Sequence, residues 1–166
     1  MTVALKPAEP VVVVGASAAG KSTLLRWLAG HLLPDAGRMA FAAQVAYKPQ
    51  EAVYIGGSLG EVVMPGQTHV HEAAVTRALR AAGLGPALDK GELGLTSDVG
   101  TNGAGVSSGQ RQMLALARVL ASDRAVLLLD QPTWAWTAAR KKVCPARGLP
   151  CAHQAAAWWW PRTQPN

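Results

Sequence analysis

The sequence has few of the features that mark secreted or membrane-spanning proteins. Its 166 residues include two cysteines, Cys144 and Cys151, whose spacing fits no common zinc pattern, and with His153 they are too few ligands for a closed metal site. No apolar run approaches the roughly 18–20 residues needed to cross a bilayer. The opening MTVALKPAEP lacks the basic-then-apolar order of a signal peptide. These absences predict a cytoplasmic chain with two incidental thiols.

Acidic residues are absent from the last part of the chain. All ten lie in residues 1–130 together with eleven basic residues, whereas residues 131–166 carry five basic residues and no acidic one. The formal net charge of +6 therefore belongs mostly to the C-terminal segment, and the body of the chain is nearly neutral. Because the excess charge lies in a tail, we expect no nucleic-acid partner.

The C-terminal segment also differs in composition. It holds five of the six tryptophans and five of the eleven prolines, and neither helical nor strand periodicity organises it. Residues 134–166 are therefore predicted to form a disordered tail. Membrane anchoring by Trp158, Trp159 and Trp160 is a less favoured alternative, because no amphipathic stretch supports it.

Apolar runs alternate with helical patterns in the first 130 residues. Four consecutive valines at residues 11–14 predict a buried parallel strand, and residues 125–129 predict a second one that ends at Asp130. A short strand is expected at residues 45–47. Helices are expected between these strands, the first at residues 21–29. This alternation predicts an α/β fold with a parallel sheet wrapped by helices.

The stretch from about 56 to 123 contains helical patterns and no convincing strand. Ser58 and Glu61 have the spacing of a capping box, and helices are expected at residues 70–82 and 111–121. The residues predicted to be buried on the last helix are Met113, Leu114, Leu116, Ala117 and Leu120. This stretch is predicted to form a helical subdomain.

The segment GASAAGKS at residues 15–22 matches the phosphate-binding loop pattern G-x-x-x-x-G-K-[ST]. It lies between the valine strand and a helix, as the pattern requires, so that backbone N–H groups and the helix dipole can surround phosphates. Lys21 is expected between the β- and γ-phosphates, Ser22 on Mg²⁺ and Thr23 near the α-phosphate. The residues predicted to bind the nucleotide here are Gly15, Ser17, Gly20, Lys21, Ser22 and Thr23.

The segment VLLLD at residues 126–130 has the form of the second half of such a site. An apolar strand delivers a carboxylate to its C-terminal end, and Asp130 is expected to hold Mg²⁺ through water, opposite Ser22.

Further motifs resemble those of ATP-binding cassette (ABC) transporters. VSSGQRQ at residues 106–112, followed by LALAR, resembles the signature LSGGQRQ, and YKPQ at residues 47–50 resembles the Q-loop. GSL at residues 57–59, followed by Glu61, is similar to the next segment of export-type members. Four motifs in order cover roughly residues 3–133.

The resemblance implies a P-loop NTPase (RecA-like) fold with a parallel sheet core and an inserted α-helical subdomain. Residues 1–133 would be a partial ABC ATP-binding domain, with its core at about 1–55 and 124–133 and its helical subdomain at about 56–123. Residues 134–166 would be a non-homologous tail.

The resemblance also implies ATP and Mg²⁺ as ligands and a mechanism. Two such domains would pair head to tail, and Ser107, Gly109 and Gln110 of one would contact the ATP that the other holds. Gln50 would sense Mg²⁺ and the attacking water, and its loop would touch a transmembrane partner. The chain would then lie on the inner face of the membrane through that partner.

The sequence departs from the family pattern in several places. Ala18, Val106 and Ser108 stand where Gly, Leu and Gly are usual. Gln131 stands where the family has a Glu that activates water, and an amide cannot act as a base near neutral pH. ATP binding is therefore expected to survive and hydrolysis to be slow.

The pattern stops after residue 133, where no strand is predicted that would carry the family's switch histidine. Only 14 residues precede Gly15, so the first strands of the domain would lie upstream. The chain is predicted to be the middle of an ABC domain, incomplete at both ends, with a tail from a shifted reading frame or a fusion.

Three functional hypotheses remain open from the sequence. The leading one is ATP binding in an ABC transport system, and the others are a non-catalytic regulatory partner and a frame-shifted product without function. Nucleotide affinity and turnover, measured together, distinguish the three. A P-loop kinase is disfavoured, because nothing in residues 106–118 suits a phosphate-acceptor lid.

Overall fold

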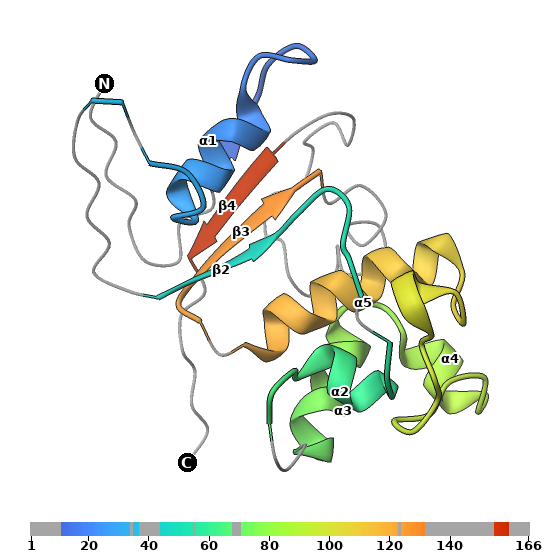
Figure 1. Ribbon diagram of the computed structural model, residues 1–166. Coiled ribbons are helices and arrows are strands. Elements are labelled where there is room, and N and C mark those ends of the chain that lie inside the picture. Colours follow the sequence, from blue (N-terminus) through green and yellow to red (C-terminus); the bar gives the residue numbers. More distant parts are fainter. Residues whose placement is uncertain are drawn as a thin grey trace. The chain divides into compact units, whose positions relative to one another are not determined.

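A computed structural model describes residues 11–33, 35–36, 44–54, 56–67, 71–122 and 124–131, and the backbone of Ala155–Trp159 (Figure 1). The chain divides into two compact units. We call residues 1–50, 123–132 and 151–166 the sheet unit, and residues 51–122 and 133–150 the helical unit. The helical unit thus begins at 51, where the sequence predicts a boundary near 56.

The sheet unit contains four described strands in the order β1-β4-β3-β2. They are β1 (Val11–Val13), β2 (Val45–Lys48), β3 (Val126–Asp130) and β4 (Ala155–Trp159). The β2 and β3 strands are parallel, with Val45 opposite Val126 and Lys48 opposite Leu129. The β4 strand runs antiparallel to both β1 and β3. The predictions of strands at residues 45–47 and 125–129 are confirmed.

Two predictions about strands are wrong. The valine run was expected to be a buried parallel strand, but β1 ends at Val13, pairs antiparallel with β4, and leaves Val14 68% exposed. The expectation that residues 134–166 lack regular structure fails at β4, which pairs with all five residues of β3.

The reason for the β4 strand lies in β3. All five residues of β3 are buried, so its backbone N–H and C=O groups need strand partners on both sides. The β2 strand supplies one side and β4 the other. The segment AAAWW has no alternation of polar and apolar residues, so periodicity alone does not detect it. Cys144, Cys151, His153 and the side chains of Trp158–Trp160 lie outside the described residues.

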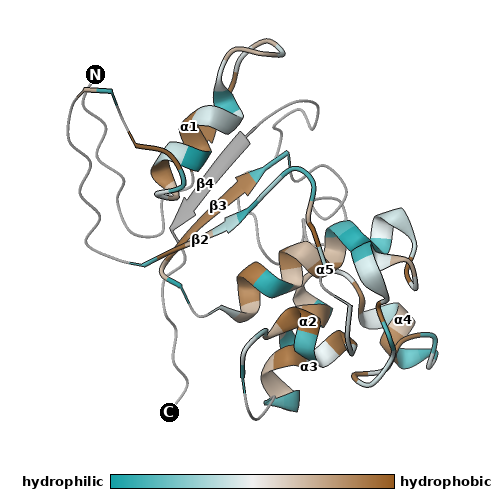
Figure 2. Ribbon diagram, in the orientation of Figure 1, coloured by the Kyte–Doolittle hydropathy of each residue, from teal (hydrophilic) through white to brown (hydrophobic). Residues whose placement is uncertain are grey.

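Helix α1 (Lys21–Leu28) packs on this sheet against β3 (Figure 1). Leu25 of α1 is fully buried in a cluster with Val126 and Leu128. The helix ends where Gly30 takes a left-handed conformation with φ 77°. The helix predicted at residues 21–29 is confirmed. The apolar character of β3 stands out in Figure 2, in keeping with burial of its two faces.

The helical unit contains α2 (Leu59–Val63), α3 (Glu72–Ala81), α4 (Gly85–Asp89), a 3₁₀ helix (Thr101–Gly103) and α5 (Ser108–Ala121). The predicted capping box is present: the Ser58 backbone N–H donates to Glu61 Oε2 at 2.8 Å. Helix α3 begins two residues after the predicted start at 70 and stops before Gly83, whose φ is 100°.

Helix α5 packs against α2 and α3 and forms the centre of the helical unit (Figure 1). The predicted burial of Met113 and Leu120 is wrong, since both are half-buried, whereas Ala115 and Val119 are buried. Contact with two neighbouring helices buries a wider face than the sequence pattern of one helix indicates. None of the helices in the described part of the chain combines the length and apolar character needed to span a bilayer.

Candidate nucleotide and magnesium site

The loop at residues 14–20 leads from β1 into α1 and is exposed throughout. Gly20 is the N-cap of α1 and has φ 86° and ψ 11°, a left-handed conformation that glycine adopts without strain. Because Gly20 has no side chain to accept the first N–H groups of the helix, these donors stay open to an anion. The loop therefore has the form of an anion-binding turn at a helix N-terminus.

Ala18 in the same loop is also left-handed, with φ 62°. This is a position where the family that the sequence resembles usually has glycine. An L-residue in this conformation costs roughly 1–2 kcal/mol. The backbone thus keeps the shape that the loop needs even though the residue type has changed.

Lys21, the first residue of α1, folds its side chain over this loop. Its Nζ donates to the carbonyl oxygens of Gly15 at 2.9 Å and Ala16 at 2.6 Å, and the residue is 9% exposed. A buried ammonium held above open backbone N–H groups creates a positive site that suits phosphate oxygens. Thr23 on the next part of α1 is exposed.

The carboxylate of Asp130 meets α1 at the C-terminal end of β3. Ser22 Oγ donates to Asp130 Oδ1 at 3.0 Å, although the two residues are 108 positions apart in the sequence. Asp130 is 1% exposed. A hydroxyl and a carboxylate are the hard oxygen donors that Mg²⁺ prefers, so these residues fit the ion that the sequence implies.

Tyr47 also contacts this carboxylate, which sequence reasoning missed. The Tyr47 hydroxyl donates to Asp130 Oδ2 at 3.2 Å. The contact follows from the strand register and not from a local sequence pattern: Tyr47 lies opposite Leu128 on β3, and residues two apart on a strand share a face, so Tyr47 and Asp130 do too. Detecting it requires knowing that β2 and β3 are neighbours.

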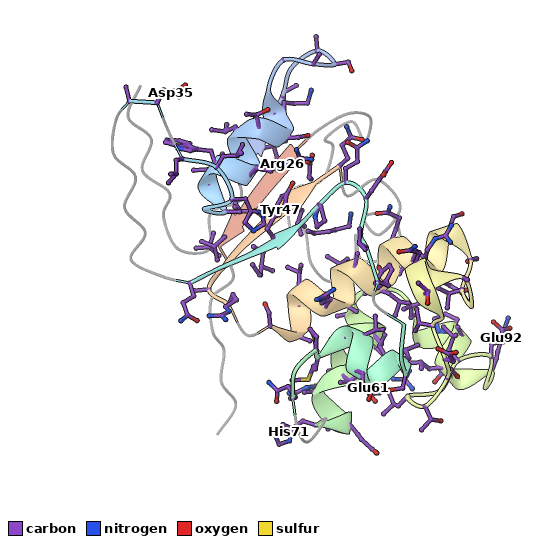
Figure 3. All side chains as sticks on the ribbon, viewed as in Figure 1. Arg26, Asp35, Tyr47, Glu61, His71 and Glu92 are labelled. Atoms are coloured by element: carbon purple, nitrogen blue, oxygen red, sulfur yellow. The ribbon has the colours of Figure 1, made fainter. Side chains whose placement is uncertain are left out.

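The surroundings of Tyr47 hold its ring in place. His31 packs edge-on against it, with ring centroids 5.4 Å apart and an interplanar angle of 81°. Burial raises the pKa of Tyr47, and nearby Asp130 raises it further, whereas a hydrogen bond with Arg26 lowers it. Figure 3 shows Arg26 on α1 next to Tyr47 on β2.

Lys48 is a second buried cation that sequence reasoning did not single out. It is 1% exposed, and its Nζ donates to the Pro49 carbonyl at 3.1 Å. Burial lowers the pKa of Lys48 to about 8, against the attraction of Asp130, which raises it. Lysine in a parallel strand whose neighbours are apolar is unusual, and the strand pattern alone does not show how completely it is buried.

The two glutamines predicted to be catalytic differ in exposure and backbone conformation. Gln50 is exposed and follows β2 and Pro49. Gln131 follows β3 directly, is half-buried, and takes a left-handed conformation with φ 44°. Such a conformation in a residue other than glycine costs about 1–3 kcal/mol and is concentrated at functional sites.

The signature-like residues belong to the helical unit, whereas all the other predicted site residues belong to the sheet unit. Ser107 is the N-cap of α5, and its backbone N–H donates to Gln110 Oε1 at 2.8 Å while the Gln110 N–H donates to Ser107 Oγ at 3.2 Å. A Cβ added at Gly109 would meet no atom within 4 Å. The capping box preforms the turn, and no described residue outside the helix covers it at Gly109.

Tyr54 makes a contact with the first turn of α5. Its side chain is buried, and its hydroxyl donates to the Arg111 carbonyl. Burial raises the pKa of Tyr54 to about 12. This second tyrosine hydroxyl thus has a structural partner within the helical unit.

Comparison with known proteins agrees with the motifs. The family model described as "ABC transporter" matches residues 1–134. An ATP-dependent lipid A-core flippase of Neisseria meningitidis serogroup A is 35% identical over 142 residues, covering 78% of this chain and 23% of the flippase. A glutathione/L-cysteine transport system ATP-binding/permease protein, CydC, of Bacillus subtilis is 33% identical over 141 residues, covering 77% of this chain and 25% of its own length.

A solved structure gives the same result for the fold. A bacterial Atm1-family ABC exporter with ATP bound is 28% identical, with a TM-score of 0.63, over 74% of this chain and 24% of that chain. The chain spans about a quarter of the length of the relatives it matches.

Proposed function

Because the chain belongs to the ABC transporter family, we propose that it binds Mg-ATP as the nucleotide-binding part of an export-type transporter. The observation that carries this proposal is the hydrogen bond of 3.0 Å between Ser22 Oγ and Asp130 Oδ1. It joins two motifs that are far apart in the sequence, at the edge of the sheet where parallel α/β folds bind ligands. Lys21 lies beside Ser22 with its ammonium already over the loop.

Each residue of the loop has a distinct part in this binding. The backbone N–H groups from Gly15 to Thr23 would surround the phosphates, and Lys21 would supply a positive charge beside the γ-phosphate. Ser22 and Gln50 would hold Mg²⁺, and Asp130 would hold it through water. When bound, the ion neutralises charge on the β- and γ-phosphates.

Gln131 supports a second candidate function from a different class. Its amide can orient a water molecule but cannot take a proton from it, so the chain would bind ATP and hydrolyse it slowly. The chain would then be the non-catalytic half of a heterodimer, with its partner supplying hydrolysis. Binding with negligible turnover would favour this role over that of an active ATPase.

Two partners follow from the family. Ser107, Gly109 and Gln110 stand on an open turn at the N-terminus of α5, where they would contact ATP held by a second ABC domain. A transmembrane partner would place the chain on the inner face of a membrane and convert nucleotide-driven pairing into transport. The name of the Bacillus subtilis relative, an ATP-binding/permease protein, supports this pairing of functions.

A nucleotide titration tests the proposal. Lys21→Ala should weaken binding of a fluorescent ATP analogue in Mg²⁺ about 10- to 100-fold, because a hydrogen bond to a charged group contributes about 1.5–3 kcal/mol. Lys90→Ala is the matched control, since Lys90 is exposed and pairs with Glu92 at 3.7 Å in the helical unit. Equal affinities of the wild type and Lys21→Ala would exclude the loop as the nucleotide site.

A further inference from the structure

Asp130 has two carboxylate oxygens, and each accepts a hydrogen bond from a different hydroxyl. Ser22 on α1 donates to Oδ1 and Tyr47 on β2 donates to Oδ2. When Mg²⁺ binds, Ser22 Oγ is expected to become a ligand of the ion. Its hydrogen bond to Asp130 Oδ1 is then expected to weaken or break. Tyr47 has no place in the proposed phosphate or metal contacts and can keep its hydrogen bond throughout.

The Tyr47 ring is itself held from more than one side. It packs against the cluster of Leu25, Val126 and Leu128, and the His31 ring makes a T-shaped contact with it at a centroid distance of 5.4 Å. Arg26 of α1 lies next to the ring (Figure 3). A hydroxyl on a ring fixed in this way can set the orientation of the carboxylate it contacts.

We propose that Tyr47 is a positioning residue that holds Asp130 by Oδ2 and so keeps Oδ1 directed at Ser22 and the magnesium position. The inference rests on the proposed function and adds a residue to it. Without such a contact, the χ2 torsion that orients an aspartate carboxylate has a broad distribution. Partners that orient the ligands of a metal typically change its affinity about 10- to 100-fold when they are removed.

Tyr47→Phe tests this role because it removes the hydroxyl and keeps the ring, with its contacts to His31 and the apolar cluster. In a titration of Mg²⁺ against the chain and a fluorescent ATP analogue, the variant should need about tenfold more Mg²⁺ for half-maximal binding. Binding of the analogue in excess chelator should stay as in the wild type. An unchanged Mg²⁺ midpoint would overturn the proposal.

Tyr54→Phe is the matched control. It removes the chain's other tyrosine hydroxyl, which donates to the Arg111 carbonyl in the helical unit. It should lower the melting temperature and leave the Mg²⁺ midpoint unchanged. An equal shift of the midpoint in both variants would assign the effect to a general loss of stability and overturn the positioning role.

A double-mutant cycle separates this inference from the proposed function. Tyr47→Phe, Asp130→Ala and the double variant are compared by thermal unfolding without nucleotide. If Tyr47 holds Asp130, the double variant loses less melting temperature than the sum of the two single losses. Additive losses would overturn the positioning role even if ATP binds. A wild-type chain that binds no ATP would refute the proposed function, while the cycle still decides whether Tyr47 holds the carboxylate.

Discussion

The sheet unit and the helical unit bury different kinds of side chain. Among the described residues, the three buried charged side chains, Lys21, Lys48 and Asp130, all belong to the sheet unit. Among the residues that the structure describes in the helical unit, the buried side chains are apolar apart from the Tyr54 hydroxyl, and the ion pairs, such as Arg80 with Asp89, lie on the surface. Burying charge costs free energy unless the group is hydrogen-bonded.

This contrast separates function from stability in the molecule. Each of the three buried charges is hydrogen-bonded, and two of them lie at the proposed nucleotide site. The helical unit is held mainly by apolar packing around α5. Changes in the sheet unit should therefore alter chemistry and pH dependence, and changes in the core of the helical unit should alter stability.

The largest effect is expected in the sheet unit at Gln131. Gln131→Glu places a carboxylate that can act as a base where the family has one, and general-base catalysis is worth about 10²–10⁴-fold. Phosphate release should rise by that factor at equal nucleotide occupancy. Gln67→Glu, at an exposed position of the helical unit, makes the same charge change and should have no effect. Equal turnover by wild type and Gln131→Glu would show that Gln131 does not limit hydrolysis.

In the helical unit the expected effect is a loss of stability. Leu79 on α3 is fully buried, and Leu79→Ala should lower the free energy of unfolding by about 2–5 kcal/mol, through lost apolar contact and the cavity left behind. Urea unfolding followed by circular dichroism measures it. Leu33→Ala is the control, because Leu33 is 93% exposed and should change stability little. A similar loss in both variants would contradict the packing account.

A smaller effect is expected from the buried lysine of the sheet unit. The pKa of Lys48 is lowered by burial to about 8 from an ordinary value of 10.5. Below pH 8 both folded and unfolded chains carry its proton, whereas between about pH 8 and 10.5 the unfolded chain binds more protons, so stability rises with pH. At 1.36 kcal/mol per pKa unit the full rise is about 3 kcal/mol.

Urea unfolding at pH 7 and at pH 10 measures this rise. Lys48→Met should be more stable than the wild type at pH 7 and should lose most of the pH dependence. Lys90→Met should keep it, since Lys90 is exposed. If the rise persists unchanged in Lys48→Met, another group causes it and the buried ammonium is not the source.

The sequence by itself determined the local elements of the site. The loop from Gly15, the start of α1 at Lys21, the capping box at Ser58 and the apolar strand that ends at Asp130 were all predicted. Each depends on residues within a few positions of one another, where periodicity, capping and the left-handed preference of glycine act directly.

Only the tertiary structure decided which distant residues meet. The β4 strand pairs with β3 because β3 needs a second backbone partner, and the segment AAAWW contains no periodic pattern that predicts a strand. The bond from Tyr47 to Asp130 spans 83 positions and depends on the register of β2 against β3. The burial of Lys48 depends on what covers its face of the strand. Such contacts follow from how strands pair and pack, and residue type and spacing along the chain do not specify that pairing.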